Sequence, residues 1–192
     1  RGLGDVYKRQ LWSTAALDAL RRHYPLARID YATGEWSRPA LAGNPDVSAV
    51  IEPSLKALRA GRYDVAMSLE RSPAAGVLPW LAGIPIRVGP NSLGRGFAHN
   101  LRVACRPDRS EAELALDCVT TLGVSTERVR AKFCPSAADL SFADAAIPLM
   151  PKQDRLGEGS LPYVTTAPGG GVNPGMNLVS KRWPAERFAT IA

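Results

Sequence analysis

The chain has 192 residues, of which 45% are hydrophobic and 22% are charged, values typical of a globular protein with one domain or slightly more. No apolar stretch approaches the roughly 20 residues that cross a bilayer, and the first residues lack the pattern of a signal peptide, so we expect neither feature. The net charge of +6 favours an anionic partner: a nucleic acid, a phosphorylated metabolite or an acidic membrane surface. Because the basic residues are scattered, we expect no nucleic-acid partner.

The cysteines and histidines do not form the pattern of a metal site. Cys105, Cys118 and Cys134 are odd in number and too far apart for a zinc knuckle or a disulfide framework. His23 and His99 are not spaced as metal ligands. We therefore expect reduced thiols, a cytoplasmic location, no metal and no cofactor.

Helical and strand patterns alternate along the first two thirds of the chain. The predicted helices are 11–24, 39–42, 55–60, 74–82 and 110–122, and the predicted strands are 27–33, 47–51, 63–69 and 87–89. In the first helix an apolar residue recurs every fourth position from Trp12 to Tyr24. Ser110 and Glu113 form a capping box at the start of the last of these helices. This alternation predicts a parallel α/β sheet with flanking helices.

A change of composition divides the chain. We expect 1–134 to form a first domain and 135–160, which is rich in proline and small residues, to be a linker. Residues 161–192 are predicted to begin a second domain with a strand, a glycine-rich loop and a helix. Since the chain starts at Arg1 without Met and stops at Ala192 inside that helix, we expect the natural protein to extend beyond both ends.

The glycine-rich loop after the strand at 161–167 has the composition of a phosphate site. Gly169, Gly170 and Gly171 would let backbone N–H groups approach a phosphate closely, and Lys181 follows where an ammonium could neutralise a diphosphate. The loop matches neither the Walker motif nor the usual dinucleotide fingerprint. By spacing alone, an ordinary surface turn is as good an interpretation as a phosphate site.

The same stretch resembles a known family. The two phrases are Pro168-Gly169-Gly170-Gly171-Val172-Asn173-Pro174-Gly175 and Ser180-Lys181-Arg182-Trp183-Pro184-Ala185-Glu186-Arg187-Phe188-Ala189. Together they resemble the start of the donor-sugar lobe in glycosyltransferase family 9, which includes the ADP-heptose:lipopolysaccharide heptosyltransferases. Weaker phrases at 16–25, 28–30, 44–47, 62–66 and 80–89 agree in order, so the resemblance covers most of the chain from Leu11 onward.

The resemblance implies a GT-B architecture, with two Rossmann-like lobes that face one another across a cleft. The chain would hold the first, acceptor-binding lobe and a truncated second lobe. The resemblance also implies transfer with inversion and without a metal, because a positive loop and a helix N-terminus stabilise the departing diphosphate. On this basis the donor diphosphate would contact Gly169, Gly170, Gly171, Ser180 and Lys181.

The general base implied by the family is an Asp in a Gly-Asp-Val phrase just before the first helix. Gly4-Asp5-Val6 resembles that phrase and makes Asp5 the candidate base. However, Asp5 stands farther upstream of the predicted helix than the family's Asp does, and the expected apolar first strand is absent. We therefore interpret residues 1–10 as a non-native junction.

Two arginines are candidates for acceptor binding. Arg71 follows the end of a predicted strand, where α/β sheets place their ligands, although 70–72 also suits a capped helix start. Arg95 lies in a glycine-rich loop that could reach an acceptor phosphate, although such a loop is more often simply exposed. Lys56, Arg59 and Arg62 would form a patch for acidic lipid if they shared a surface, but such clusters are usually solvated.

The function predicted on the resemblance is transfer of a heptose-like sugar from an ADP-sugar to a lipopolysaccharide core or lipid-linked acceptor. The enzyme would work in the cytoplasm, in peripheral contact with the anionic inner membrane, and this chain would be inactive alone. Two alternatives stay open: a GT-B transferase for another nucleotide-sugar, and a non-catalytic module that binds a phosphate ligand.

Overall fold

The computed structural model describes residues 4–146. It divides into two compact units, of which the larger is Val6–Cys134. Helix α5 (Ala137–Ala146) belongs to the other unit and is described by itself.

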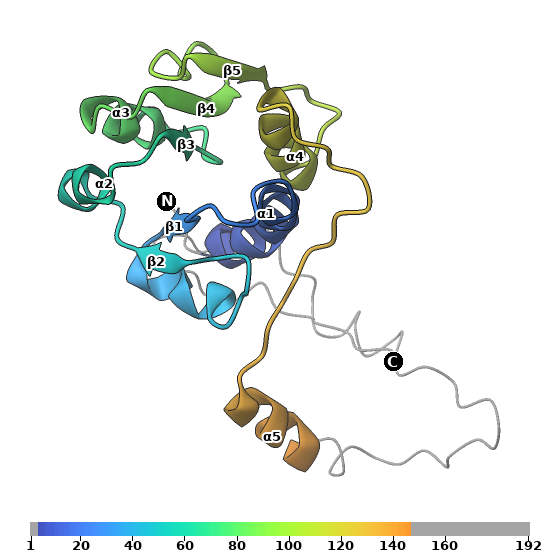
Figure 1. Ribbon diagram of the computed structural model, residues 1–192. Coiled ribbons are helices and arrows are strands. Elements are labelled where there is room, and N and C mark those ends of the chain that lie inside the picture. Colours follow the sequence, from blue (N-terminus) through green and yellow to red (C-terminus); the bar gives the residue numbers. More distant parts are fainter. Residues whose placement is uncertain (1–3, 147–192) are drawn as a thin grey trace. The chain divides into compact units, whose positions relative to one another are not determined.

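The larger unit alternates strands and helices, as Figure 1 shows. Its strands are β1 (Asp30–Ala32), β2 (Ala49–Ile51), β3 (Val65–Met67), β4 (Ile86–Asn91) and β5 (Leu101–Ala104). Its helices are α1 (Gly4–His23), the 3-10 helix η1 (Glu35–Leu41), α2 (Leu55–Gly61), α3 (Pro73–Leu81) and α4 (Glu111–Thr121). The α/β class predicted from the alternating pattern is confirmed.

Every pair of neighbouring strands is parallel, as predicted. The strands form two sheets rather than the one expected, with the orders β1-β2 and β3-β4-β5. In the part of the chain that the structure describes, no strand pairs with both β1 and β3 to join the two sheets. The residues that precede β1 form helix α1 and not such a strand. A side-chain hydrogen bond, from the Tyr63 hydroxyl to Oδ2 of Asp30 at 2.5 Å, joins the two sheets where these strands begin.

The apolar core lies where α4 packs against both α1 and the three-stranded sheet. Ala115 and Val119 of α4 contact Ala16 and Ala19 of α1. On a neighbouring stripe of α4, Leu114 and Cys118 pack against Val88 and Val103 of β4 and β5. Residues four apart share one face of a helix, so two such pairs let one helix bury two surfaces.

Helix α1 differs from its prediction in two ways. It begins at Gly4 rather than near Leu11, because Lys, Arg and Gln extend a helix without needing an apolar face. The ends of the predicted apolar stripe, Trp12 and Tyr24, are 39% and 43% exposed, whereas the polar Thr14 and Asp18 are buried. The buried face of α1 is therefore partly polar.

Two elements were missed in the sequence. Strand β5 pairs with β4 through a crossover of nine residues, 92–100, that contains turns and no helix, so the usual strand, helix, strand rhythm does not reveal it. Helix α5 lies inside the segment interpreted as a linker. Its Ser136 side chain accepts a hydrogen bond from the Asp139 N–H at 3.1 Å, a local cap that we did not recognise among the small residues there.

Candidate functional site

Several loops and helix ends meet at the carboxyl edge of the strands, where open α/β sheets bind their ligands. A small pocket at this edge is lined by Trp12, Ser13, Leu69, Glu111 and Ala115. These residues come from the first half of α1, the end of β3 and the first turns of α4. The pocket is therefore the candidate ligand site of the described lobe.

Hydrogen bonds hold α1 against the end of β1 beside this pocket. Gln10 Nε2 donates to Thr33 Oγ1 at 3.1 Å, and the hydroxyls of Ser13 and Tyr31 lie 3.0 Å apart. Gln10 is only 4% exposed, and its Oε1 has no hydrogen-bond partner among the described residues. A buried free carbonyl oxygen can accept a hydrogen bond from a ligand hydroxyl.

Tyr31 remains a neutral phenol at this edge. Burial raises the pKa of Tyr31, the Glu70 carboxylate raises it further, and the hydrogen bond with Ser13 opposes them. A phenol with a raised pKa donates or accepts hydrogen bonds without acting as a base near neutral pH. Tyr31 is suited to positioning a ligand, and Glu70 is the exposed carboxylate close enough to affect it.

Arg71, a predicted acceptor contact, follows β3 by four residues, and an ion pair holds it in place. Its Nη2 lies 2.8 Å from Oε1 of Glu111, in the first turn of α4. The Arg71 Nε is buried and has no acceptor in the described part of the chain. The pair leaves a donor on Arg71 for a ligand oxygen, while Glu111 fixes the direction of the guanidinium.

Arg95, the second predicted acceptor contact, lies on the crossover between β4 and β5. Its side chain is exposed, and no ion pair to it is found within residues 4–146. Arg95 is not among the residues that line the pocket.

The other predicted site residues are only partly covered by the structure. Asp5 lies in the first turn of α1, inside the helix rather than ahead of it as expected. The predicted donor contacts lie outside the described residues: Gly169, Gly170, Gly171, Ser180 and Lys181. Their roles and that of Asp5 stay predictions.

The described residues hold no group of three or more His, Cys, Asp or Glu side chains that could bind a metal ion. Over the same residues no helix has both the length and the hydropathy to span a membrane. Burial raises the pKa of the Cys118 thiol to about 12, with smaller contributions from Asp117 and Cys105, so Cys118 is a core residue and not a nucleophile.

Sequence reasoning missed most of the pocket. Trp12 was assigned to an apolar stripe, and Ser13 and Glu111 of the lining received no role, nor did Tyr31, which contacts Ser13. Each of these residues is ordinary in its local context, and only the packing of α1 and α4 brings them together. The available signal was position, since Tyr31 and Glu111 lie near the carboxyl ends of strands in an α/β pattern.

No protein-family model matches the chain. Among curated proteins, it is 27% identical over 213 residues to lipopolysaccharide heptosyltransferase 2 of Escherichia coli K12, covering 99% of this chain and 56% of that protein. It is 26% identical over 209 residues to the protein of the same name from Salmonella typhimurium LT2, with the same coverages. The chain spans about half the length of the curated relatives it matches.

Two solved structures share the fold. The Escherichia coli ADP-heptose lipopolysaccharide heptosyltransferase II matches 77% of this chain and 48% of its own, with 22% identity and a TM-score of 0.61. A glycosyl transferase of family 9 from Veillonella parvula matches 100% of this chain and 56% of its own, with 21% identity and a TM-score of 0.66. The chain resembles glycosyltransferase family 9. These similarities confirm the resemblance to this family and the fold that the sequence motifs predicted.

Proposed function

We propose that the full-length protein is a glycosyltransferase that moves a heptose-like sugar from an ADP-sugar to a lipopolysaccharide core or lipid-linked acceptor. The similarity to two lipopolysaccharide heptosyltransferases, at 27% and 26% identity in alignments that cover 99% of the chain, carries this proposal. The transfer would proceed in the cytoplasm with inversion and without a metal, and this chain would be inactive alone.

In this proposal the described lobe binds the acceptor. The pocket between α1, Leu69 and α4 offers the Trp12 ring as an apolar surface for a sugar. Arg71, which is paired with Glu111 of the pocket lining, adds a fixed cation beside it. Tyr31 and Ser13 supply neutral hydroxyls beside it. An aromatic face, a fixed cation and hydroxyls are the groups that a phosphorylated sugar needs.

The donor diphosphate would bind the glycine-rich loop Gly169-Gly170-Gly171 with Ser180 and Lys181. Backbone N–H groups and an ammonium stabilise the negative charge that develops on the diphosphate as the sugar leaves. The base for the acceptor hydroxyl would be the Asp of the family's Gly-Asp-Val phrase; Asp5 carries that phrase in this chain, but it is displaced into α1.

The test is a transfer assay on the full-length protein with ADP-heptose and heptose-deficient lipopolysaccharide, using Lys181→Ala as the variant. Loss of a transition-state charge contact should lower kcat by roughly 100-fold or more. Arg38→Ala, an exposed arginine of η1, is the matched control and should keep full activity.

The outcomes separate the alternatives. Unchanged turnover in Lys181→Ala would remove Lys181 from the mechanism. Transfer from UDP- or GDP-sugars in preference to ADP-heptose would favour a GT-B transferase that uses another nucleotide-sugar. Tight binding of nucleotide without any transfer by the full-length protein would favour a phosphate-binding module.

A further inference from the structure

Strands β1 and β3 are each paired on one side only within the described part of the chain. β1 pairs with β2 and β3 pairs with β4, so the opposite side of each strand carries no ladder there. β4, which is paired on both sides, buries Val88, Gly89 and Pro90, whereas β1 and β3 bury none of their residues. Such unpaired sides are unusual in parallel sheets, whose strands are normally paired and covered.

The hydrogen-bond register shows which residues of β1 face its unpaired side. The Thr33 N–H donates to the Ile51 carbonyl at 3.0 Å, so Thr33 faces β2. In an extended strand the backbone groups of successive residues point to opposite sides. Tyr31 therefore also faces β2, and Asp30 and Ala32 face away from it. Within residues 4–146 the N–H and C=O groups of Asp30 and Ala32 lie outside the ladder.

The same reasoning gives the unpaired side of β3. The Ser68 N–H donates to the Val88 carbonyl at 2.8 Å, so Ser68 faces β4. Alternation then turns the backbone groups of Met67 and Val65 away from β4. Val65 is 40% exposed, a large value for a valine in a parallel strand. We call these two unpaired sides the open edges: Asp30 and Ala32 of β1 with Val65 and Met67 of β3.

Contacts at both ends place the open edges side by side. At the amino ends, the Tyr63 hydroxyl donates to Oδ2 of Asp30 at 2.5 Å. At the carboxyl ends, the Tyr31 hydroxyl lies 3.0 Å from that of Ser13, which lines the pocket together with Leu69, two residues beyond β3. The two strands therefore run in the same direction. Figure 1 shows β1 and β3 with no strand drawn between them among the described residues.

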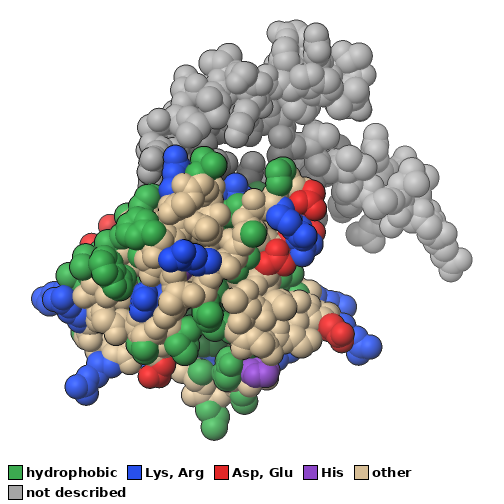
Figure 2. Space-filling model, turned by 90° about the horizontal axis from the view of Figure 1, so that it is seen from above, with side chains coloured by type: hydrophobic (Ala, Val, Ile, Leu, Met, Phe, Trp, Pro, Cys, Tyr) green, Lys and Arg blue, Asp and Glu red, His purple; other side chains and the backbone are tan. Residues whose placement is uncertain are grey.

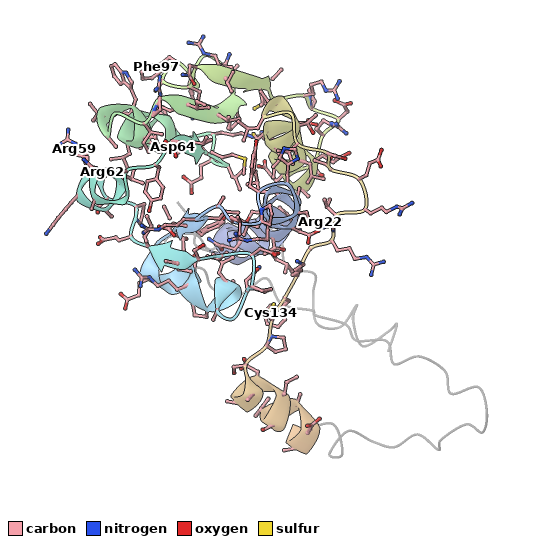
Figure 3. The ribbon with its side chains drawn as sticks, in the orientation of Figure 1. Arg22, Arg59, Arg62, Asp64, Phe97 and Cys134 are labelled. Carbon is pink, nitrogen blue, oxygen red and sulfur yellow. The ribbon has the colours of Figure 1, made fainter. Side chains whose placement is uncertain are left out.

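A buried carboxylate oxygen at the open edge of β1 lacks a donor. The Asp30 side chain is only 1% exposed, and its Oδ2 binds Arg28 and Tyr63. Its Oδ1 has no hydrogen-bond partner among the described residues. Figure 3 shows a second carboxylate, Asp64, where the chain enters β3. Because a buried acceptor without a donor is rare, we expect an N–H group at the start of an incoming strand to supply it.

The exposed apolar side chains elsewhere on the lobe do not mark a site in this way. Figure 2 shows hydrophobic side chains interspersed with Lys and Arg on the face seen from above. Mixed surfaces of this kind are normal in globular proteins. The open edges differ because they present rows of unpaired backbone groups, and such a row specifies an extended partner.

We propose that the open edges of β1 and β3 together bind one extended apolar segment of another polypeptide, which runs parallel to both strands. Alternate residues of the segment pair with β1 and with β3, so each existing ladder continues into the next. About five residues suffice, since strands of this length are common. Aliphatic β-branched side chains fit best, because a parallel strand paired on both sides is buried on both faces. This binding does not depend on the proposed sugar transfer.

The experiment measures the fluorescence anisotropy of a labelled peptide titrated with the 192-residue chain. The peptide has alternating valine and isoleucine residues between two lysines, with blocked ends, and its binding should be saturable. N-methylation of either alternate set of residues should weaken binding by about tenfold or more, because that set loses its hydrogen bonds to one edge. A peptide that used a single edge would tolerate methylation of the other set.

Proline variants test each edge of the chain. Val65→Pro and Ala32→Pro each remove an N–H that faces an open edge and leave the ladders to β4 and β2 in place. Each should weaken peptide binding by about tenfold or more. Val50→Pro is the matched control: Ile51 faces β1, so the Val50 N–H faces the outer side of β2, and this variant should bind as the unmodified chain does.

Hydrogen exchange gives a second measurement on the unmodified chain, which decides the question if a proline variant does not fold. The amides of Ala32, Val65 and Met67 should exchange quickly in the free chain and slow by about tenfold or more when the peptide is added. The amide of Val50 should not change.

Three results would overturn the proposal. Absence of saturable binding by the unmethylated peptide excludes the site. Weakening by only one of the two methylated sets, or undiminished binding by the folded Val65→Pro or Ala32→Pro chain, excludes pairing with both edges. Self-association in sedimentation that Val65→Pro abolishes, without peptide binding, would assign the open edges to a second copy of the chain.

Discussion

His99 lies at the contact between α3, β4 and the crossover, and two glycines make room for it. A Cβ on Gly89 would be 2.4 Å from the His99 ring, and one on Gly76 would be 2.8 Å away. These distances are too short for any side chain, so glycine is required here for space. His99 is 3% exposed, so the fold encloses its ring.

Stability should fall at mildly acidic pH because of His99. Burial lowers the pKa of His99, the positive charges of Arg87 and Arg102 lower it further, and a weaker interaction with the Pro90 main chain opposes them. The unfolded chain takes up this proton near pH 6.5 while the folded chain does not, so the free energy of unfolding decreases as pH falls below about 6.5. Urea unfolding should therefore give a lower free energy of unfolding at pH 5.5 than at pH 7.5.

His99→Gln should flatten that part of the pH dependence. If His99→Gln does not fold, the ring resonances of His99 in the unmodified chain provide the second measurement. A His99 ring that titrates at or above pH 6.5 in the folded chain would contradict the prediction.

At the scale of single residues, the sequence predicts where a side chain lies relative to a strand or helix, but it does not predict which distant residues that side chain contacts. Arg71 was correctly placed near the carboxyl end of a strand, since β3 ends at Met67. Its partner Glu111 is 40 residues away, and only the packing of α4 beside β3 brings them within 2.8 Å. Likewise the burial of His99 was not predicted, because nothing local indicates that Gly76 and Gly89 contact it.

At the scale of elements, the segment after α4 runs along α1 in a regular register. Arg22 Nη2 donates to the Arg128 carbonyl, Asp18 accepts from the Arg130 N–H, and Thr14 accepts from the Lys132 N–H. Two residues of extended chain advance about 6.6 Å, and four residues of helix advance about 6 Å. The two repeats nearly match, so successive contacts form without strain.

Ion pairs reinforce this register. Lys132 Nζ lies 2.7 Å from Asp18 Oδ1 and 2.7 Å from Asp46 Oδ2, so it bridges α1 and the loop after η1. Burial acts to raise the pKa of Asp18, but hydrogen bonds from Lys132 and Arg22 outweigh it and lower the pKa. Burial acts to lower the pKa of Lys132, but its bonds to the two carboxylates raise it.

Lys132→Met should lower the free energy of unfolding at pH 7 by about 3 kcal/mol, because it leaves the buried Asp46 carboxylate without a cation among the described residues and leaves Asp18 with Arg22 alone. Arg106→Met is the control: it removes a surface pair with Asp108 at 3.9 Å and should change stability by less than about 0.5 kcal/mol. Denaturant unfolding measures both.

Since the pKa of Asp18 is lowered in the folded chain, its stabilisation is present above about pH 4 and is lost as pH falls further. Below about pH 4 the loss of stability caused by Lys132→Met should become smaller. Equal losses for Lys132→Met and Arg106→Met at pH 7 would show that the buried ion pairs stabilise the fold no more than the surface pair does.

Local patterns predict elements well when the signal lies inside the element. The capping box of Ser110 and Glu113 is present, with the Glu113 N–H to Ser110 Oγ bond at 3.3 Å. Strand β5 has no such signal, because its four residues are defined by pairing with β4 across a crossover without a helix. Helix α1 was predicted too short because apolar spacing reports the buried face and not the helix ends.

At the scale of the whole molecule, the parallel sheets and the flanking helices agree with a lobe of a two-lobed glycosyltransferase, and Figure 1 shows α1 beside α4 and α2 beside α3. Strand patterns could not predict the division into two sheets, since it depends on whether a further strand pairs with both β1 and β3. Tyr63 and Asp30 join these strands by side chains alone.

The last prediction concerns nucleotide binding by this chain of 192 residues. It spans about half the length of its curated relatives, and the expected donor contacts within it are confined to a glycine-rich loop, Ser180 and Lys181. Such contacts hold a diphosphate but do not distinguish one base from another, because selectivity requires groups that contact the base and ribose. Calorimetric titration with ADP, UDP and GDP should therefore give similar dissociation constants of about millimolar strength, or no binding. Lys181→Ala should abolish what binding there is, while Arg38→Ala should not change it. A micromolar constant for ADP with clear preference over UDP and GDP would mean that the chain already holds a complete nucleotide site, and the division of acceptor and donor binding between two lobes would have to be abandoned.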